Sequence, residues 1–152
     1  MQFRPVGGFD GELLGELHRR CFTAPWDRAW SARSFAEILA LPGAAGLIAA
    51  AGDEPLGFGL TLQAVDEVEL LLLAILPERR GQGLAKELLA RLLDAATAKG
   101  ARRAFLEVAV GNAAAIGCYV GGGFQVSGRR KHYYPGGVDA LMFEKPLELN
   151  NI

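Results

Sequence analysis

Residues 67–100 read EVELLLLAILPERRGQGLAKELLARLLDAATAKG, and this stretch decides the fold. An apolar run over residues 70–76 stops at Pro77, as is typical of a buried strand. From about Gly83 to Lys99 the apolar residues recur at helical spacing, and Gly100 stands at the C-terminal cap position. The stretch therefore predicts a buried strand, a glycine-rich turn and a long helix. The buried stripe of this helix is expected to consist of Leu84, Leu88, Leu89, Leu92, Leu93 and Ala96.

The turn between the strand and the helix is suited to a phosphate. The first turn of a helix leaves backbone N–H groups unpaired at the positive end of the helix dipole. Gly81 and Gly83 carry no side chain that would keep a phosphate from the backbone, and Arg79, Arg80 and Lys86 add local positive charge. We therefore expect a phosphate-bearing ligand at this turn.

Two well-known phosphate loops do not fit the turn. A Walker A loop requires Gly-Lys-Ser/Thr, but Lys86 follows Ala85 and precedes Glu87. A dinucleotide fingerprint requires a third glycine at the position where Lys86 stands. Both nucleotide interpretations are therefore disfavoured.

Patterns on both sides of this stretch predict the remaining elements. Strands are expected at 2–6, 46–51, 56–63, 67–76, 104–110, 124–131 and 140–145, and helices at 10–21, 31–41, 83–99 and 112–120. Asp10 and Ser31 are expected as helix N-caps, and Trp30 is expected to pack on Phe35. We therefore predict an α+β fold in one domain over residues 1–152, with a mixed, mostly antiparallel sheet flanked by helices.

Composition excludes several classes of protein. Among 152 residues, 16 Lys plus Arg against 17 Asp plus Glu give a net charge of −1, so no global field favours nucleic acid or an anionic membrane. No apolar run approaches the roughly 18 residues of a spanning helix, and the N-terminus lacks a secretory pattern, so a cytoplasmic location is expected. Two cysteines and two histidines are too few for a zinc cluster, and no metal is expected.

A strand and a short helix downstream carry the polar residues suited to chemistry. Glu107 is the only charged residue between Phe105 and Phe124, and a carboxylate among apolar neighbours loses solvation, which favours a general base. Asn112 and Tyr119 are nearly two helical turns apart and are expected to face one ligand. The alternatives are a glutamate at a sheet edge and a tyrosine that merely packs in the core.

Residues 80–85, Arg-Gly-Gln-Gly-Leu-Ala, match the acetyl-CoA motif Gln/Arg-x-x-Gly-x-Gly/Ala, and the sequence resembles the GNAT acetyltransferase superfamily. Within it, the chain is similar to the bacterial ribosomal-protein-alanine N-acetyltransferases. The matching residues are Pro25-Trp26, Leu106-Glu107-Val108, Asn112, Tyr119, Gly123-Phe124, Arg129-Arg130 and Tyr133-Tyr134-Pro135. The resemblance implies a GNAT-like domain whose central pair of strands is splayed.

The resemblance also implies roles for individual residues. The acetyl-pantetheine arm of acetyl-CoA is expected along the backbone of Leu73, Ala74 and Ile75, and its pyrophosphate at Gly81, Gln82, Gly83, Leu84, Ala85 and Lys86, with Asn112 as a further contact. Glu107 would accept a proton and Tyr119 would donate one. Trp26, with Tyr133 and Tyr134 on a hairpin loop, would bind the acceptor. The chain departs from the pattern at Leu72, Ala109, Gly111 and Val120, near the acceptor side.

The implied reaction is direct acetyl transfer, without a metal, to the N-terminal amine of a protein. The alanine terminus of a small-subunit ribosomal protein is the expected acceptor, and neither nucleic acid nor a membrane is an expected partner. Two alternatives stay open. One is a GNAT enzyme that acts on a lysine side chain or a small amine, and the other is a non-catalytic acyl-CoA-binding module in which Glu107 and Tyr119 only pack.

Overall fold

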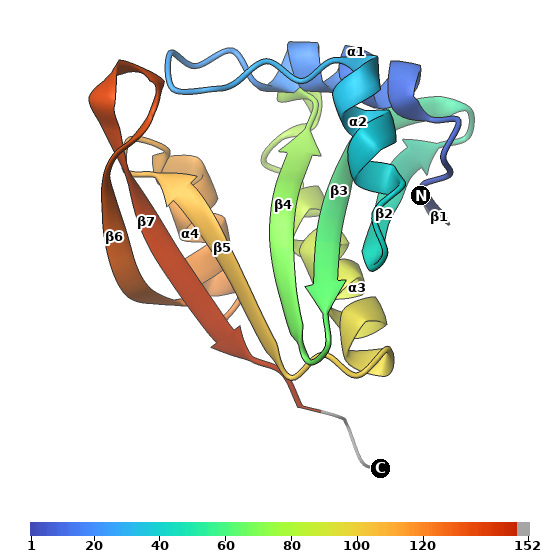
Figure 1. Cartoon of the computed structure of the whole chain (residues 1–152). Coiled ribbons are helices and arrows are strands. Elements are labelled where there is room, and N and C mark those ends of the chain that lie inside the picture. Colours follow the sequence, from blue (N-terminus) through green and yellow to red (C-terminus); the bar gives the residue numbers. More distant parts are fainter. Residues whose placement is uncertain (149–152) are drawn as a thin grey trace.

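The computed structural model describes residues 1–148, and within them seven strands form one mixed sheet of order β1-β2-β3-β4-β5-β7-β6 (Figure 1). The strands are β1 Gln2–Pro5, β2 Ala44–Ala51, β3 Glu54–Ala64, β4 Glu67–Ile75, β5 Arg103–Ala109, β6 Gln125–Tyr134 and β7 Val138–Pro146. The helices are α1 Gly11–Cys21, α2 Ala32–Leu39, α3 Leu84–Ala98 and α4 Ala113–Gly121, with short 3-10 turns at Pro77–Arg79 and Pro135–Gly137. The predicted α+β class is confirmed.

Hydrophobic packing on both faces of the sheet holds these elements together. The predicted stripe of α3 is buried against one face, together with core residues of β4, β5 and α4. On the other face, α1 and α2 pack on β2, β3 and β4 through Leu14, Leu17 and Phe35, whose ring meets Phe58 edge-on at 5.8 Å between centroids. In Figure 1 the α3 and α4 helices accordingly lie behind the sheet and α2 in front of it. None of the helices within residues 1–148 is long and apolar enough to cross a membrane.

The two predicted caps have different outcomes. Ser31 caps α2 by accepting a hydrogen bond from the Ser34 backbone, and the Trp30 ring packs on Phe35 at 5.2 Å between centroids, as predicted. Asp10 occupies the N-cap position of α1 as predicted, and its carbonyl accepts from the Leu14 backbone, but its side chain makes no cap hydrogen bond to the helix. The Asp10 carboxylate is buried and instead forms an ion pair with Arg4 at 2.9 Å.

The hairpin between β6 and β7 differs from the prediction. We expected β6 to end near Lys131 and the two tyrosines to lie on a loop, but β6 continues to Tyr134. The strand has a register irregularity between Arg130 and Tyr134, where His132 adopts a positive φ of 54°. Tyr134 then pairs with Val138 of β7, so the tyrosines are held by the sheet.

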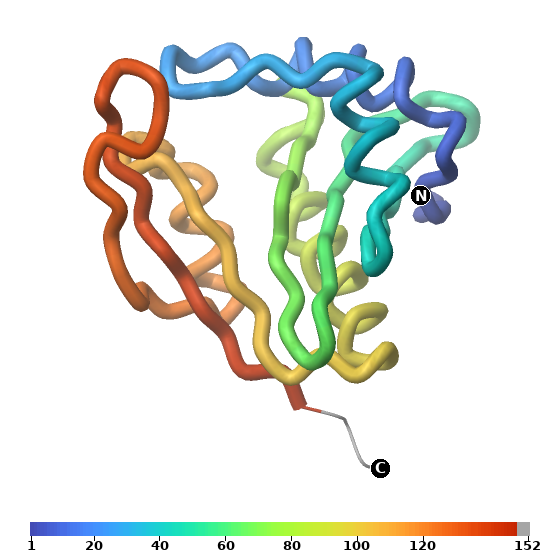
Figure 2. Tube along the Cα trace, viewed as in Figure 1, coloured from blue at the N-terminus to red at the C-terminus, as the bar shows by residue number. Residues whose placement is uncertain are grey.

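The parallel strands β4 and β5 separate near the middle of the sheet. They pair only over Glu67–Glu69 and Arg103–Phe105, whereas β5 stays paired with β7 up to Ala109. Leu71 is bulged out of the register between β4 and β3. Figure 2 shows the two traces diverging from their common lower end. The splayed central pair that the resemblance implied is therefore present.

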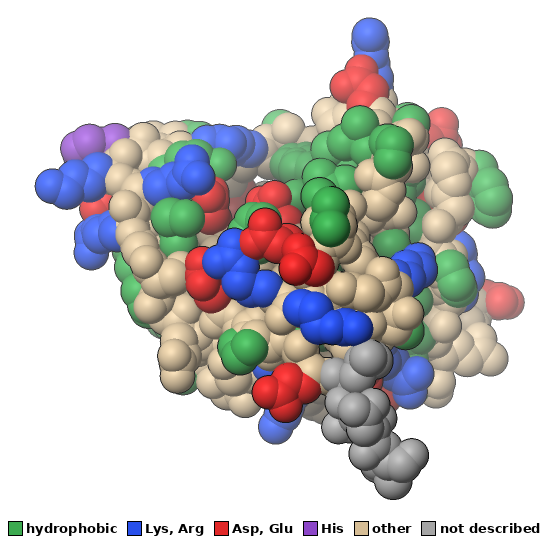
Figure 3. Space-filling view, turned by 60° about the horizontal axis from the view of Figure 1, so that its bottom comes forward, with side chains coloured by type: hydrophobic (Ala, Val, Ile, Leu, Met, Phe, Trp, Pro, Cys, Tyr) green, Lys and Arg blue, Asp and Glu red, His purple; other side chains and the backbone are tan. Residues whose placement is uncertain are grey.

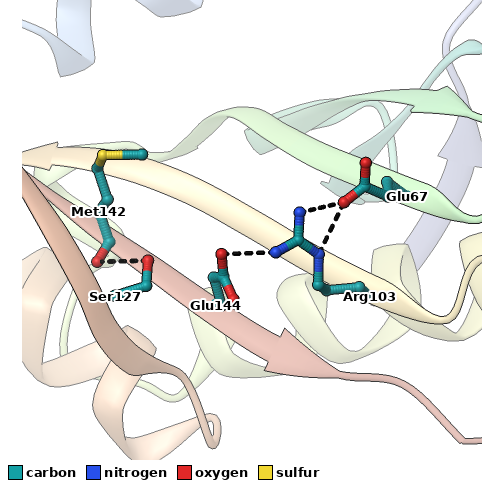
Figure 4. A network of polar contacts seen from close by, with 5 residues as sticks. All are labelled: Glu67, Arg103, Ser127, Met142 and Glu144. Carbon is teal, nitrogen blue, oxygen red and sulfur yellow. Dashed lines mark hydrogen bonds and ion pairs between the residues drawn. The ribbon is translucent and has the colours of Figure 1, made fainter.

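A network of ion pairs lies where β4 and β5 still touch. The Arg103 guanidinium bridges Glu67 of β4, with Nε 2.7 Å from Oε2, and Glu144 of β7, with Nη1 2.6 Å from Oε1 (Figure 4). Viewed from this end of the molecule, acidic and basic side chains lie next to one another near the middle of the surface (Figure 3). Arg103 thus connects the two halves of the sheet at the closed end of the splay.

Candidate active site

The glycine-rich turn leaves the start of α3 open. Gly83 is the N-cap residue, with a φ of 79° and no side-chain cap, and Gly81 has a φ of 81°. A Cβ atom added to either glycine would meet no atom within 4 Å. The first hydrogen bond of the helix runs from Glu87 to the carbonyl of Gly83, which leaves the preceding N–H groups without helical partners. This turn therefore fits a diphosphate.

Arg80 has a structural role that the sequence did not indicate. Its Nε donates to the carbonyl of Ile75 at 3.0 Å, and an Nη donates to the carbonyl of Cys21 at 3.1 Å. Arg80 therefore ties the turn to the end of β4 and the end of α1. Lys86 forms no ion pair with any other residue in the described part of the chain, so its charge is available to a ligand.

The turn opens into a first cavity of about 590 Å³. Its lining brings together residues from α1, β4, the turn and α4, including Cys21, Phe22, Trp26, Leu73, Ala74, Ile75, Gly81, Gly83, Leu84, Ala85, Lys86, Asn112 and Tyr119. Of the residues expected to bind the cofactor, only Gln82 does not line this cavity, and it is exposed. The predicted set otherwise meets at one place.

A second cavity of about 230 Å³ adjoins the first and shares Trp26, Leu73, Asn112 and Tyr119 with it. Both cavities lie where β4 and β5 have separated. The second is further lined by Glu69, Glu107, Arg28, Tyr133 and Tyr134. The predicted base and the predicted acceptor-binding tyrosines therefore share the second cavity, and Tyr119 lies between this cavity and the glycine-rich turn.

The end of β4 offers backbone groups to the space between the strands. Leu76 donates its N–H to Leu56 of β3 at 2.9 Å. In an antiparallel pair the backbone groups of successive residues alternate in direction, so those of Ile75 face away from β3. The Ile75 carbonyl accordingly accepts from Arg80, and Ile75 lines the first cavity on the side that faces away from β3.

Glu107 lies in a more polar environment than the sequence predicted. The alternation of β5 is as expected, since Leu106 and Val108 belong to the core while the Glu107 side chain faces the second cavity. The prediction of apolar neighbours is wrong, because Oε1 of Glu107 lies 3.0 Å from Nε of Arg130. Hydrogen bonding to Glu107 also raises the pKa of the Tyr133 hydroxyl.

The buried Tyr119 and the half-buried Tyr134 face the same space. Tyr119 is only 8% exposed, packs edge-on against Phe124, and burial raises the pKa of its hydroxyl. Burial, followed by the charge of Glu107, raises the pKa of Tyr134 to about 12. Both hydroxyls therefore stay protonated at neutral pH, which is the form that can donate a proton.

The segment between α1 and α2, residues 22–31, reaches the β6–β7 hairpin through Arg28 (Figure 1). An Nη of Arg28 donates to the carbonyl of Tyr133 at 2.7 Å, and the guanidinium lies 4.9 Å from the Tyr133 ring centroid and 5.7 Å from that of Tyr134. Trp26 of the same segment packs over Gly111, where a Cβ would lie 3.1 Å from Cζ3 of the indole. These contacts place residues 22–31 along the second cavity.

A model of the acetyltransferase (GNAT) family matches residues 12–124. The chain belongs to the GNAT acetyltransferase family. An Escherichia coli (strain K12) ribosomal protein bS18-alanine N-acetyltransferase is 36% identical over 95 residues, 60% of this chain and 64% of that protein's length. A Bacillus subtilis (strain 168) protein, whose name assigns it the same activity provisionally, is 34% identical over 88% of this chain and 87% of its own length. A crystal structure of the Escherichia coli S18-alanine enzyme superposes with a TM-score of 0.87 at 26% identity, covering 99% of this chain and 97% of that one.

Two residues of this GNAT site were missed by sequence reasoning. Arg28 carries no motif, and only the fold brings it to Tyr133. Glu69 could have been noticed, because it lies two residues after Glu67 and the two carboxylates therefore share one face of an otherwise apolar strand. Within residues 1–148, no group of three or more His, Cys, Asp or Glu side chains is arranged to hold a metal ion.

Proposed function

We propose that the chain transfers the acetyl group of acetyl-CoA to the N-terminal α-amine of a protein. The observation that carries this proposal is the meeting of two cavities at Tyr119, one open to the glycine-rich turn and the other containing Glu107. We extend the proposal to residues 1–152 as one N-acetyltransferase domain that works in the cytoplasm.

The first cavity would hold the cofactor. The N–H groups at the start of α3 would bind the diphosphate, and Lys86 would add a charge. Asn112 already uses its side-chain oxygen to cap α4, accepting from Ala115 at 3.2 Å, which leaves its amide N–H groups for the ligand. When bound, acetyl-CoA supplies a thioester as the acetyl donor.

Three groups of the chain would serve the transfer. Glu107 accepts the proton that the acceptor ammonium must lose before it can attack. The Ile75 N–H stabilises negative charge on the carbonyl oxygen that is attacked. Tyr119, buried and protonated, donates a proton to the departing thiolate. The described site offers these roles without a covalent intermediate on the protein.

Two features favour a protein N-terminus as the acceptor. An α-amine has a pKa of about 7.7 to 8.0, well below that of a lysine side chain near 10.4, so a single carboxylate suffices to deprotonate it at neutral pH. Arg28 and Tyr133 close over the small second cavity, which suits the narrow end of a chain. The names of the Escherichia coli and Bacillus subtilis relatives support the alanine terminus of a small-subunit ribosomal protein.

The test is to incubate the protein with acetyl-CoA and three kinds of peptide. One begins with a free alanine, one has a blocked N-terminus and an internal lysine, and one has neither amine. We expect CoA release and a mass gain of one acetyl group only with the first peptide. Transfer to the lysine peptide alone would favour the side-chain alternative, and CoA binding without release would favour the binding module. A strain that lacks the gene should contain one small-subunit ribosomal protein lighter by one acetyl group.

A further inference from the structure

Glu69 lies at the point where β4 and β5 separate. It is the last residue of β4 that pairs with β5, and its partner there is Phe105. Glu107 follows two residues later on β5 and therefore lies on the same face as Phe105. Both carboxylates line the second cavity. Glu69 thus lies at the closed end of the splay and lines the same cavity as Glu107, the residue proposed as the base.

Glu69 differs from its neighbours in having no cation of its own. Two residues earlier, Glu67 pairs with Arg103, and on β5 Glu107 pairs with Arg130. Within residues 1–148, no side chain or backbone group forms a hydrogen bond or an ion pair with the Glu69 carboxylate. Burial, and then the charge of Glu107, raise the pKa of Glu69, while Arg130 opposes them.

The other charged groups that line the second cavity do not compensate Glu69. Asp27 is a further acid, and its carboxylate accepts a hydrogen bond from the backbone of Ala24 at 2.9 Å. Arg28 is held by the carbonyl and the ring of Tyr133. Burial lowers the pKa of His18, so its ring is neutral at neutral pH. The cavity therefore has excess negative charge, centred on a partly desolvated carboxylate.

We propose that Glu69 binds the acceptor amine in its ammonium form and holds it beside Glu107. This inference rests on the proposed function and deepens it. A partly buried carboxylate without a partner gains most when a cation arrives, because the cation replaces the solvation that burial removed. An α-amine is mostly an ammonium at neutral pH, so Glu69 selects the form that is present in solution. Glu107, which already forms an ion pair with Arg130, then takes the proton from the ammonium group.

The decisive experiment measures binding without turnover. With the protein saturated by CoA, calorimetry compares a peptide that begins with alanine with a matched peptide whose α-amine is replaced by a hydroxyl group. We expect the wild type to prefer the amine by roughly 10- to 100-fold, as a charge-assisted hydrogen bond implies. Glu69→Gln should abolish that preference, and Glu69→Asp should keep part of it. Glu67→Gln, on the same face of the same strand but outside the cavity, should keep all of it.

Kinetics give a second readout. In Glu69→Gln the KM for the amine peptide should rise by the same factor, with a smaller change in kcat, whereas loss of the base Glu107 should act mainly on kcat. An unchanged amine preference in Glu69→Gln, or no preference in the wild type, would overturn the inference. Because the binding comparison needs no transfer, a wild type that prefers the amine but releases no CoA would contradict only the proposed function. Circular dichroism of each variant checks that the fold is intact.

Discussion

An Nη of Arg28 lies 2.7 Å from the carbonyl oxygen of Tyr133, and this bond joins residues that are 105 positions apart in the chain. It connects the segment between α1 and α2 to the end of β6, and the guanidinium also contacts the rings of Tyr133 and Tyr134. A single side chain therefore positions two walls of the second cavity relative to each other.

Replacing Arg28 should weaken acceptor binding while leaving cofactor binding intact. Arg28→Met removes both the hydrogen bond and the cation–π contacts, and because the side chain is exposed we expect KM for the peptide to rise by about 3- to 10-fold. Arg33→Met, on the exposed face of α2, is the matched control and should change neither constant. Equal peptide KM values in the two variants would mean that the contact between Arg28 and Tyr133 does not shape the second cavity.

In the glycine-rich turn, the effect of backbone strain on stability can be separated from the effect of a side chain that blocks CoA binding. Gly83→Val and Gly52→Val each place a side chain at a positive φ with open space around it, and each should lower the free energy of unfolding by about 1–2 kcal/mol. Gly52 lies in the turn between β2 and β3, whereas Gly83 lines the first cavity. Calorimetry should find CoA binding lost only in Gly83→Val; similar affinities in both variants would contradict the assignment of the turn.

Tyr119→Phe tests the proposed proton donor. We expect turnover to fall by roughly 10²- to 10⁴-fold with a modest change in CoA affinity, because only the hydroxyl group is removed from a ring that packs on Phe124. Since burial raises the pKa of Tyr119, the wild-type rate should not decline through loss of this proton below about pH 10. A wild-type rate in the variant would leave Tyr119 as a packing residue only.

The raised pKa of Tyr134, about 12, predicts a loss of stability in alkali. In the unfolded chain this hydroxyl ionises near pH 10, whereas in the fold it keeps its proton until about pH 12. The unfolded state therefore binds fewer protons between these values, and stability falls as pH rises through that window. In thermal melts from pH 9 to 12, Tm should fall less steeply with pH for Tyr134→Phe than for the wild type. Equal slopes in the two proteins would contradict a raised pKa of the Tyr134 hydroxyl.

Asp10 should contribute stability that acid removes. The Arg4 side chain, which hydrogen-bonds to this carboxylate, holds the pKa of Asp10 below its usual range, so the contribution is complete above about pH 4 and is lost as pH falls through the lower folded value. Asp10→Asn should lower the free energy of unfolding by about 1–2 kcal/mol near pH 7. The gap in Tm between variant and wild type should close in stronger acid, while Glu12→Gln, an exposed residue of the same helix, should show little gap at any pH.

Local patterns were enough to predict most of the fold. The strand, turn and helix of residues 67–100 were recognisable because apolar spacing, Pro77 and Gly100 agree with one another, and the structure has β4 and α3 there. The end of β6 was missed because the pair between Tyr134 and Val138 depends on the register of the whole hairpin. Pro135 and the glycines after it indicated a turn but did not mark where it begins.

In the candidate site, residues that are near one another in the sequence were predicted, whereas those that only the fold brings together were not. Residues close together in the sequence, such as Gly81 and Gly83, were found from their motif. The neighbours of Glu107 were not, since Arg130 comes from β6 and Glu69 from β4. The N-cap position of Asp10 was found from the sequence, but its side-chain partner was not, because Arg4 lies on the preceding strand.

The three-residue contact between β4 and β5 also bears on how the molecule assembles. Strands β1 to β4 pair with their neighbours in chain order, and β5, β6 and β7 form a second antiparallel group. Each group can therefore pair its strands without the other, and docking then closes the parallel contact, the Arg103 bridge and the core shared by α3, β4, β5 and α4. The second cavity takes walls from both groups, so a chain with both groups folded but undocked would have native-like secondary structure and no acceptor site. Enzyme activity would then report the last event of folding, which spectroscopic measures of secondary structure would miss.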